Sequence, residues 1–160
     1  MKQEVKEDEQ FLDMIRQNEG IIYKVASFYA DVDHPISDLY QEVVLNLWKS
    51  FASFRGDSKY STWIYRIALN TCVSFYRRSK RNVTYVDISM DIPDTVDNRE
   101  DIQELYKLIN RLGKIERALV LLYLDDKSYK EIAEITGLSI TNVATKLSRI
   151  KEKLRQMSDE

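Results

Sequence analysis

The sequence is poor in residues that interrupt helices and in residues that build metal or disulfide sites. Its 160 residues include four glycines, two prolines, one cysteine and one histidine. So few glycines and prolines favour a mostly helical protein with few tight turns. The lone Cys72 and the lone His34 exclude an intrachain disulfide framework and a Cys/His metal cluster. The sequence therefore predicts no metal and no other cofactor.

Long apolar runs are also missing. No run approaches the roughly 18 residues of a membrane span, and the first ten residues, MKQEVKEDEQ, lack the apolar centre of a signal peptide. We therefore expect a cytoplasmic protein without membrane insertion. The sequence contains no phosphate-binding loop and no Ser/His/Asp set, so an enzyme is disfavoured. An unusual acid/base site built from scattered carboxylates stays open at this point.

The net charge of −2 conceals an alternation of acidic and basic blocks. Residues 1–31 hold seven acids and four bases, whereas residues 49–81 hold one acid and eight bases. Residues 82–104 hold seven acids and one base, and residues 140–157 hold one acid and five bases. Solvated helix faces explain any single block equally well. Because non-specific DNA affinity depends on phosphate neutralisation, we expect weak binding to free DNA and the need for a partner.

Apolar residues recur at helical spacing along most of the chain. The pattern predicts helices over about 6–29, 37–51, 60–81, 99–112 and 115–124, the last of them buried. Ser37 is a candidate N-cap of the second helix, Ser61 or a neighbour caps the third, and Gly113 suits a helix C-terminus. Residues 82–98 carry no helical stripe and predict a flexible acidic linker. A short strand over 83–88 is the alternative, although no second strand is available to pair with it.

The segment 60–81, YSTWIYRIALNTCVSFYRRSKR, combines aromatic rings with basic residues and contains no acid. Aromatic rings beside fixed positive charge suit unstacked bases on a phosphate backbone. Tyr60, Trp63 and Tyr65 are the candidate stacking rings. Trp63 also begins an apolar stripe, so a packing role explains it equally well. Cys72 fits buried packing.

A helix-turn-helix pattern lies near the C-terminus. Ser128 and Glu131 have the spacing of a capping box, Gly137 suits positive φ at a tight turn, and Ser139 suits the cap of the next helix. We therefore predict a helix on each side of the turn, the second over about 140–157. Its outward side chains are hydrogen-bonding or cationic, which suits base edges and phosphates. An ordinary helical hairpin with a basic face is the plainer alternative.

Taken together, these segments resemble an extracytoplasmic-function (ECF) type sigma factor of the sigma-70 family. The resemblance rests on DLYQEV at 38–43 with Leu45, Leu47 and Trp48, on FRGDS at 54–58, on TWIYRIALN at 62–70, and on the helix-turn-helix ending in LSRI at 147–150. It implies an all-α fold of two small helical domains. A region 2-like domain of three to four helices would cover 5–81, an acidic linker 82–98, and a region 4-like helix-turn-helix domain 99–158.

The resemblance also implies a function, namely promoter-specific transcription initiation on core RNA polymerase by a protein without catalytic activity of its own. The residues expected to contact the β′ clamp helices of the polymerase are Asp38, Gln41, Glu42, Leu45 and Trp48. A packing role in the core is the alternative for Trp48. Those expected to bind and melt the −10 element, with a base flipped into the loop at 54–60, are Arg55, Asp57, Tyr60, Trp63, Arg66, Asn70, Arg77 and Arg78. Those expected at the −35 element are Ser139, Thr141, Asn142, Thr145, Lys146, Arg149 and Lys153.

Further implied partners are the polymerase β flap, promoter DNA and an anti-sigma factor. Ala144 stands where many relatives have a basic residue, so the base contacts do not transfer one for one. The rival interpretation is a freestanding helix-turn-helix regulator with a helical sensory or dimerisation domain. Such a regulator would bind duplex DNA by itself, typically as a dimer on paired half-sites, whereas a sigma factor would require the polymerase.

Overall fold

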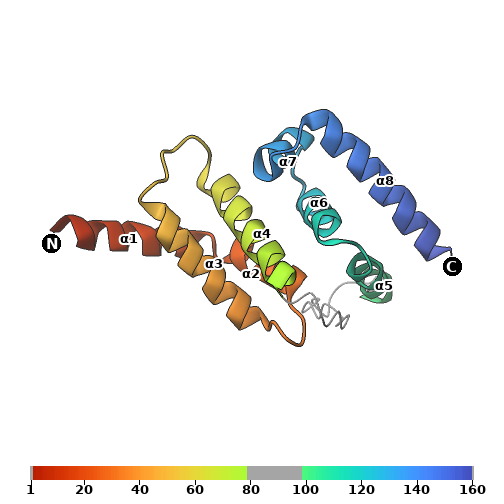
Figure 1. Ribbon diagram of the computed structural model, residues 1–160, viewed down its shortest axis with the longest axis horizontal. Coiled ribbons are helices and arrows are strands. Elements are labelled where there is room, and N and C mark those ends of the chain that lie inside the picture. The colour runs from red at the N-terminus through yellow and green to blue at the C-terminus, as the bar shows by residue number, and fades with distance from the viewer. Residues whose placement is uncertain (1, 79–98, 160) are drawn as a thin grey trace.

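The computed structural model describes residues 2–78 and 99–159, and these ranges form eight helices without a strand (Figure 1). The N-terminal domain consists of α1 (Lys2–Gln17), α2 (Glu19–Tyr29), α3 (Ile36–Phe51) and α4 (Tyr60–Arg78). The C-terminal domain consists of α5 (Arg99–Asn110), α6 (Lys114–Leu124), α7 (Tyr129–Thr136) and α8 (Ile140–Ser158). The predicted all-α fold of two small helical domains is confirmed. The linker predicted over 82–98, with its alternative strand, lies outside the described residues.

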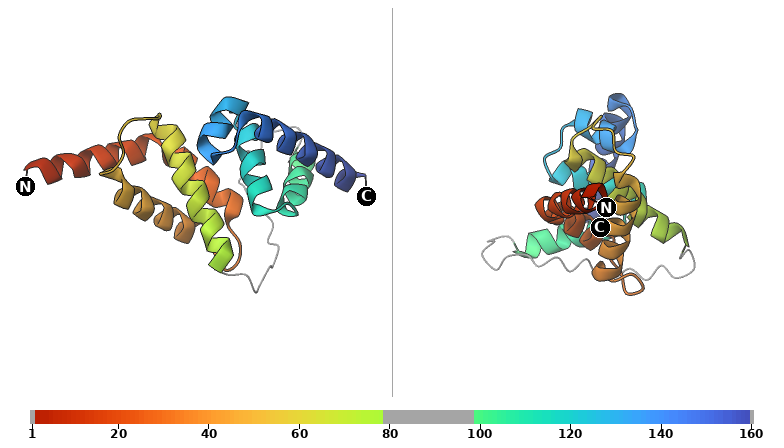
Figure 2. Two further views of the ribbon diagram at one scale, coloured as in Figure 1. Left: turned by 45° about the horizontal axis from the view of Figure 1, so that its top comes forward. Right: turned by 90° about the vertical axis from the view of Figure 1, so that its left-hand side faces the viewer.

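The prediction of one continuous first helix is wrong. α1 ends and α2 begins on either side of Asn18, whose side-chain amide donates to the Met14 carbonyl at 2.8 Å. An Asn side chain that bonds to nearby backbone groups competes with the helical hydrogen bonds, and apolar periodicity does not report this competition. The N-terminal part of α1 projects away from the rest of its domain (Figure 2), whereas Phe11, Met14 and Ile15 near its other end are buried.

Three predicted helix ends are also wrong. α3 starts after Pro35, whose extended backbone makes it the N-cap, so Ser37 falls within the first turn. Ser61 lies inside α4, which starts one residue earlier. Gly113 has an ordinary φ of −66° and stands before α6, and its N–H donates to Glu116 Oε1 at 3.2 Å. It therefore caps the N-terminus of α6 instead of ending α5 with positive φ.

The core of the N-terminal domain forms where α2, α3 and α4 pack against one another. Apolar side chains at helical spacing bury themselves there, and they include Val25, Ala26, Leu39, Val43, Leu47, Ile64 and Ala68. Each large aliphatic side chain among them contributes about 1.5–3 kcal/mol when it leaves water. Cys72 is fully buried, and this burial raises the pKa of its thiol to about 12. The predicted packing role of Cys72 is confirmed.

The helix-turn-helix forms as its local signals predict. The Ser128 hydroxyl accepts from the Glu131 N–H at 3.1 Å, while the Glu131 carboxylate accepts from the Ser128 N–H at 3.2 Å. Gly137 has φ +81° at the turn, which a side chain would oppose. Ser139 then caps α8 by accepting from the Asn142 N–H at 3.1 Å. α7 and α8 are thereby fixed at the angle that presents α8 outward.

α6 is only partly buried, although its sequence predicts a helix buried throughout. Residues 118–122 are buried, but Ile115, Tyr123 and Leu124 are exposed. The helix has α5, α7 and α8 on one side and α2 and α4 of the other domain on another, which leaves its two ends uncovered. In the described part of the chain, no helix combines the length and apolar character needed to cross a membrane.

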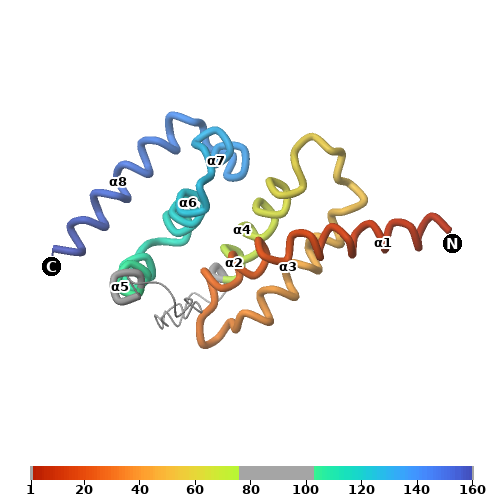
Figure 3. The backbone as a smooth tube through the Cα atoms, turned by 180° about the vertical axis from the view of Figure 1, so that it is seen from behind, coloured from red at the N-terminus to blue at the C-terminus, as the bar shows by residue number. Residues whose placement is uncertain are grey.

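The two domains lie side by side and touch. Figures 1 and 3 show the C-terminal helices grouped beside the N-terminal domain. The contacts run from α4 to α6 and α7 and from α2 to α6. The helix predicted to bind the −10 element is therefore the main element that faces the second domain.

Candidate protein and nucleic-acid interfaces

The residues expected to bind the polymerase lie along one exposed face of α3. Asp38 and Gln41 are exposed and Glu42 is half-buried, while Leu45 and Trp48 are each 44% exposed. The spacing of three and four residues brings them into one row. Two large apolar side chains beside carboxylates make a surface with an apolar centre and a charged rim, which suits a protein partner.

Trp48 is held in place at one end of this row. Its ring meets the edge of the Phe11 ring from α1 at a centroid distance of 4.9 Å, and Phe11 also contacts Phe51 at 5.4 Å. Contact with Phe11 of α1 thus restricts the orientation of the exposed Trp48 ring. A preorganised aromatic side chain loses little conformational entropy when a partner covers it.

The loop between α3 and α4 is anchored by Phe54. The Phe54 ring stacks on Tyr60 with centroids 4.9 Å apart and lies 4.9 Å from Trp63. Arg55 and Asp57 are exposed on the loop, on either side of Gly56, whose φ of +76° makes the turn. The packing of Phe54 on Tyr60 and Trp63 thus holds the loop that carries Arg55 and Asp57.

The candidate stacking rings of α4 differ sharply in exposure. Tyr60 is 46% exposed and available, whereas Trp63 is 8% exposed because it packs on Phe54 and Phe51. Tyr65 is fully buried. In this arrangement Trp63 has the packing role that the sequence left open.

Two polar and basic candidates of α4 lie on its surface. Arg66 and Asn70 are exposed. Arg77 and Arg78 belong to the last turn of α4, and their side chains lie outside the described set. Asn70 opens onto a groove of about 470 Å³ between α3 and α4. The groove is lined by Glu42, Asn46, Lys49, Ile67, Asn70, Thr71, Ser74 and Phe75.

This groove brings together residues that the sequence assigns to separate tasks. Glu42 belongs to the predicted polymerase face and Asn70 to the predicted −10 site, yet both line it. Asn46, which the sequence did not single out, donates to the Thr71 hydroxyl at 2.9 Å across the groove. That bond ties α3 to α4 beside Asn70. No spacing signal marks Asn46, because its partner lies on another helix.

α8 exposes most of the residues expected at the −35 element. Thr141, Asn142, Thr145 and Arg149 are exposed, and Lys146 is half-buried. Thr141 and Asn142 lie in the first turn of the helix, where the positive end of the helix dipole also favours phosphate.

Three of the residues expected at the −35 element already have partners within the protein. The Thr145 hydroxyl donates to the Thr141 carbonyl at 3.0 Å. Ser139 is exposed but uses its hydroxyl as the helix cap. Lys153 pairs with Glu116 at 3.1 Å, which ties α8 to α6. A phosphate contact by Lys153 therefore requires that ion pair to break, whereas Arg149 needs no such rearrangement to meet DNA.

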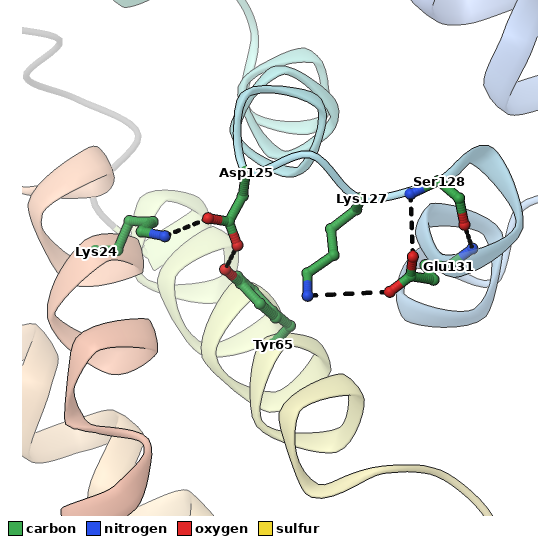
Figure 4. A network of polar contacts seen from close by, with 6 residues as sticks. All are labelled: Lys24, Tyr65, Asp125, Lys127, Ser128 and Glu131. Atoms are coloured by element: carbon green, nitrogen blue, oxygen red, sulfur yellow. Dashed lines mark hydrogen bonds and ion pairs between the residues drawn. The ribbon is translucent and has the colours of Figure 1, made fainter.

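A polar cluster joins the two domains at Asp125, in the turn after α6 (Figure 4). One carboxylate oxygen accepts from Lys24 of α2 and the other accepts from the Tyr65 hydroxyl of α4. Lys127 lies over the Tyr65 ring, 5.4 Å from its centroid. We call Lys24, Tyr65 and Asp125 the Asp125 cluster.

The Asp125 cluster alters the proton affinities of its members. Burial works to raise the pKa of the Asp125 carboxyl, but the hydrogen bonds from Lys24 and Tyr65 and the charges of Lys24 and Lys127 outweigh it. The pKa of Asp125 is therefore below its ordinary value. Burial, followed by the hydrogen bond to Asp125 and its charge, raises the pKa of Tyr65. At neutral pH Asp125 is therefore a carboxylate and Tyr65 a neutral phenol.

Further contacts cross between the described parts of the two domains. Arg66 donates to the Glu134 carbonyl at 2.6 Å, near the C-terminus of α7, where the helix dipole favours a cation. The Tyr29 hydroxyl donates to the Lys114 carbonyl at 2.7 Å. The ring of Phe28 lies edge-on to that of Tyr106 at 6.3 Å. The sequence predicted none of these contacts.

The fold is that of a helical protein of two small domains, the second of which contains a helix-turn-helix. The Sigma-70 region 2 family matches residues 14–82, and the Sigma-70 region 4 family matches residues 102–154. The RNA polymerase sigma factor YlaC of Bacillus subtilis is 33% identical over 132 residues, covering 74% of this chain and 75% of YlaC. The ECF RNA polymerase sigma-E factor of Haemophilus influenzae is 30% identical over 134 residues, covering 73% of this chain and 71% of that protein.

The chain therefore belongs to the ECF group of the sigma-70 family, whose members direct RNA polymerase to promoters. The sigma factor RpoE of Bartonella quintana, solved with the anti-sigma factor NepR, has the same fold, with a TM-score of 0.71 at 20% identity. That match covers 92% of this chain and 97% of RpoE. CnrH, solved with the cytosolic domain of CnrY, gives a TM-score of 0.69 at 18% identity over 95% of this chain and 89% of CnrH. These findings do not favour a freestanding regulator.

Proposed function

We propose that this sigma factor docks on the β′ clamp helices of core RNA polymerase through the exposed face of α3. The observation that carries the proposal is the pairing of exposed Leu45 and Trp48 with the acids Asp38 and Glu42 on one helix face. A folded monomer gains nothing from leaving a tryptophan and a leucine in water together. A partner that covers them removes apolar surface from water, while the carboxylates select a basic partner surface.

Promoter binding is divided between the two domains in this proposal. The loop anchored by Phe54 and the exposed residues of α4, including Tyr60 and Asn70, bind the separated strands of the −10 element. α8 enters the major groove at the −35 element, with Arg149 as its charged contact and Asn142 as a polar one. Linking two modest DNA-binding surfaces on one chain raises the effective concentration of the second once the first is bound.

Further parts of the proposal follow from the family. The C-terminal domain also contacts the β flap, and an anti-sigma factor regulates the protein by covering the α3 face. The domains extend over 5–81 and 99–158 and are joined by 82–98. The protein works in the cytoplasm, where core polymerase acts, and the chemistry of RNA synthesis stays with the polymerase.

Reconstituted transcription with purified core RNA polymerase tests the proposal. The protein is expected to give promoter-specific start sites only when core polymerase is present. Trp48→Ala should weaken core binding at least tenfold, because buried tryptophans at interface centres commonly contribute about 2 kcal/mol or more. Tyr23→Ala is the matched control, because Tyr23 is an equally exposed aromatic residue on α2 and should leave core binding unchanged.

Two results would contradict the proposal. One is a purified protein that never associates with core polymerase and binds a palindromic duplex tightly by itself. The other is equal loss of core binding in the Trp48 and Tyr23 variants. Thermal melting of both variants shows whether loss of the Trp48 contact with Phe11 has disturbed the fold.

A further inference from the structure

We propose that the groove between α3 and α4 extends the −10 site onto α3, and that Asn46 is a specificity-determining residue that accepts a hydrogen bond from the amino group of a base. The proposal rests on the proposed function, because it assumes that α4 binds the −10 element. It adds a residue of the polymerase-docking helix to the DNA-binding surface and states which kind of base the groove selects.

The groove is formed by one face of each helix. α3 contributes Glu42, Asn46 and Lys49, which are spaced four and three residues apart. α4 contributes Ile67, Asn70, Thr71, Ser74 and Phe75. The volume of about 470 Å³ falls within the range of roughly 300–1,000 Å³ that is common for small-ligand sites. The groove therefore has room for a group of the size of a nucleobase.

A chain of two hydrogen bonds fixes the orientation of the Asn46 carboxamide. The Thr71 hydroxyl donates to the Ile67 carbonyl at 2.7 Å, and the same hydroxyl oxygen accepts from Asn46 at 2.9 Å. Because a hydroxyl has only one proton to donate, the Asn46 group that faces Thr71 must be the amide nitrogen. The carboxamide oxygen of Asn46 therefore points away from Thr71.

The Asn46 oxygen is left as an acceptor that needs a donor. Within the described ranges 2–78 and 99–159, the Asn46 side chain makes a hydrogen bond only with Thr71. Asn46 is half-buried, but its oxygen is not among the buried polar atoms without a partner, so it is open to the groove. An acceptor held in one direction selects a ligand that presents an N–H group.

Asn70 provides a second amide beside the first. Asn70 follows Ile67 by three residues and precedes Thr71, so it lies next to the bond that Asn46 makes. Its side chain is exposed and makes no hydrogen bond with the described residues. Adenine, cytosine and guanine carry an amino group on their edges, whereas thymine has none. The groove therefore favours a base with an amino group over thymine.

Charge along the groove favours a strand that continues from the loop between α3 and α4. The two helices run antiparallel on either side of that loop (Figure 1). Lys49 lies at the end of the groove nearest the loop, is exposed, and forms no ion pair with the described residues. Glu42 lies at the far end. A phosphate is attracted by Lys49 and repelled by Glu42, so a strand that leaves the loop places its phosphate at Lys49 and its base at Asn46.

A segment of the polymerase is the alternative occupant, because Glu42 also belongs to the predicted docking face. The apolar centre of that face lies elsewhere on α3. Leu45 and Trp48 each precede a groove residue by one position, which is a rotation of about 100° around the helix. Most of the groove is lined by polar side chains, so it lacks the apolar centre of a typical protein interface. These observations favour DNA.

Transcription by the holoenzyme from promoters with base analogues tests the proposal. Each base is first placed at each −10 position, to find the position at which the wild type prefers a base with an amino group. The preferred base is then replaced by its analogue without that group, namely purine for adenine, pyrimidinone for cytosine or hypoxanthine for guanine. The yield of open complexes should fall about fivefold, the effect of losing one ordinary hydrogen bond. In Asn46→Ala the same analogue should have little effect, because the residue and the amino group contribute through one interaction.

Three further variants separate base recognition from packing. Asn18→Ala is the matched control, because Asn18 is also half-buried, also donates its amide at 2.8 Å, and does not line the groove. It should leave the effect of the analogue unchanged. Thr71→Val frees the Asn46 carboxamide to turn, so the effect of the analogue should lie between those in the wild type and in Asn46→Ala. Lys49→Gln should weaken open complexes by a similar factor whichever base is present, because a phosphate contact carries no base identity.

A second measurement uses the free protein without polymerase. Short single strands of deoxyadenosine, deoxycytidine or thymidine are titrated into the protein, and the side-chain amide signal of Asn46 is followed by NMR. The Asn46→Ala variant identifies that signal. The signal should move at lower concentrations of the deoxyadenosine or deoxycytidine strand than of the thymidine strand, by about fivefold. A signal that no strand moves would contradict the proposal.

The outcomes also distinguish this proposal from the proposed function. An analogue effect of the same size in the wild type and in a folded Asn46→Ala variant would overturn the role of Asn46. Loss of core polymerase binding in Asn46→Ala would assign the groove to the polymerase instead. Failure of the wild type to transcribe with core polymerase would contradict the proposed function, and the NMR titration would still decide whether the groove binds bases.

Discussion

α4 and α8 are the two helices with proposed DNA contacts, and they differ in what covers them. α8 lies at the edge of its domain, with Thr141, Asn142 and Arg149 exposed to solvent. α4 is covered on two sides. Its own domain buries Ile64, and the C-terminal domain occupies the side that carries Tyr65.

The difference matches the DNA that each helix is proposed to bind. An intact duplex presents its groove without rearrangement, so a rigid helix on a capped turn suffices. Separated strands exist only after melting, and bases leave the stack at a cost of a few kcal/mol. In the structure the C-terminal domain covers the side of α4 that carries Tyr65, and that side is not open to DNA. In the proposed function, the exposed helix α8 binds the intact duplex, and the partly covered helix α4 binds strands that form only after melting.

The largest expected effect comes from Trp63, which tests the buried side of α4. Trp63→Ala should destabilise the protein by about 3–5 kcal/mol, because it leaves a cavity beside Phe54 and Phe51. Urea denaturation measures this loss. Tyr60→Ala, on an exposed ring of the same cluster, should cost far less stability.

Kinetics of promoter opening add a second measurement on the Trp63 variant. If the ring serves packing alone, closed-complex and open-complex formation should fall together. A selective loss of open complexes with little loss of stability would show that Trp63 contacts DNA, and the contrast between a covered α4 and an exposed α8 would then be weaker.

Arg149 tests the exposed side of the comparison. Arg149→Ala should cost about 1–3 kcal/mol in transcription that depends on the −35 element, the usual contribution of one good base contact. Core polymerase binding should be unchanged. Arg155→Ala is the control, because Arg155 is an exposed arginine on the last turn of α8. Loss of polymerase binding in the Arg149 variant would contradict its assignment to DNA.

Local signals account for what the sequence predicted well. The capping pair Ser128 and Glu131, the turn at Gly137 and the cap at Ser139 all depend on neighbours within a few residues, so the helix-turn-helix was predictable residue by residue. The break at Asn18 is also a local effect. It was not predicted, because a side chain that bonds to its own helix does not change the apolar periodicity.

The contacts between the domains belong to a different class. Lys24 and Asp125 are 101 positions apart in the chain, and Tyr65 and Asp125 are 60 apart. None of the three has a sequence spacing that marks it as part of a site. An acid in a turn and a lysine on a helix are ordinary surface residues until folding brings them together. The sequence predicted both domains but not the interface between them.

Glycine substitutions test how rigidly α8 is presented. Gly137→Ala should destabilise the C-terminal domain by about 1–2 kcal/mol, because φ of +81° is unfavourable for an L-residue. Duplex binding should weaken with it, as α7 and α8 lose their fixed angle. Gly20→Ala is the matched control, because Gly20 lies within α2 and a methyl group there meets no atom within 4 Å. It should stabilise the protein by about 0.5 kcal/mol. Equal effects at both sites would show that the turn tolerates a side chain.

The smallest expected effect is a pH dependence of the contact between the two domains. The pKa of Asp125 in the closed protein is below the ordinary value of 3.8. The Asp125 carboxylate therefore contributes its full stabilisation of the domain contact above pH 3.8. This contribution is lost as the pH falls through the lowered pKa of Asp125. Because the pair is partly exposed, we expect less than about 1 kcal/mol.

The distance between spin labels at Lys59→Cys and Lys130→Cys, two exposed positions on either side of the domain contact, isolates this contribution when it is measured in the wild type and in Asp125→Asn from pH 7 downward. Acid effects at other carboxylates occur in both proteins and cancel in the difference. The two proteins should differ at pH 7 and converge below the lowered pKa, since a protonated Asp125 is as neutral as asparagine. A difference that persists at low pH would mean that the substitution disturbs packing instead of charge. The covering of α4 would then depend on shape and not on the ion pair.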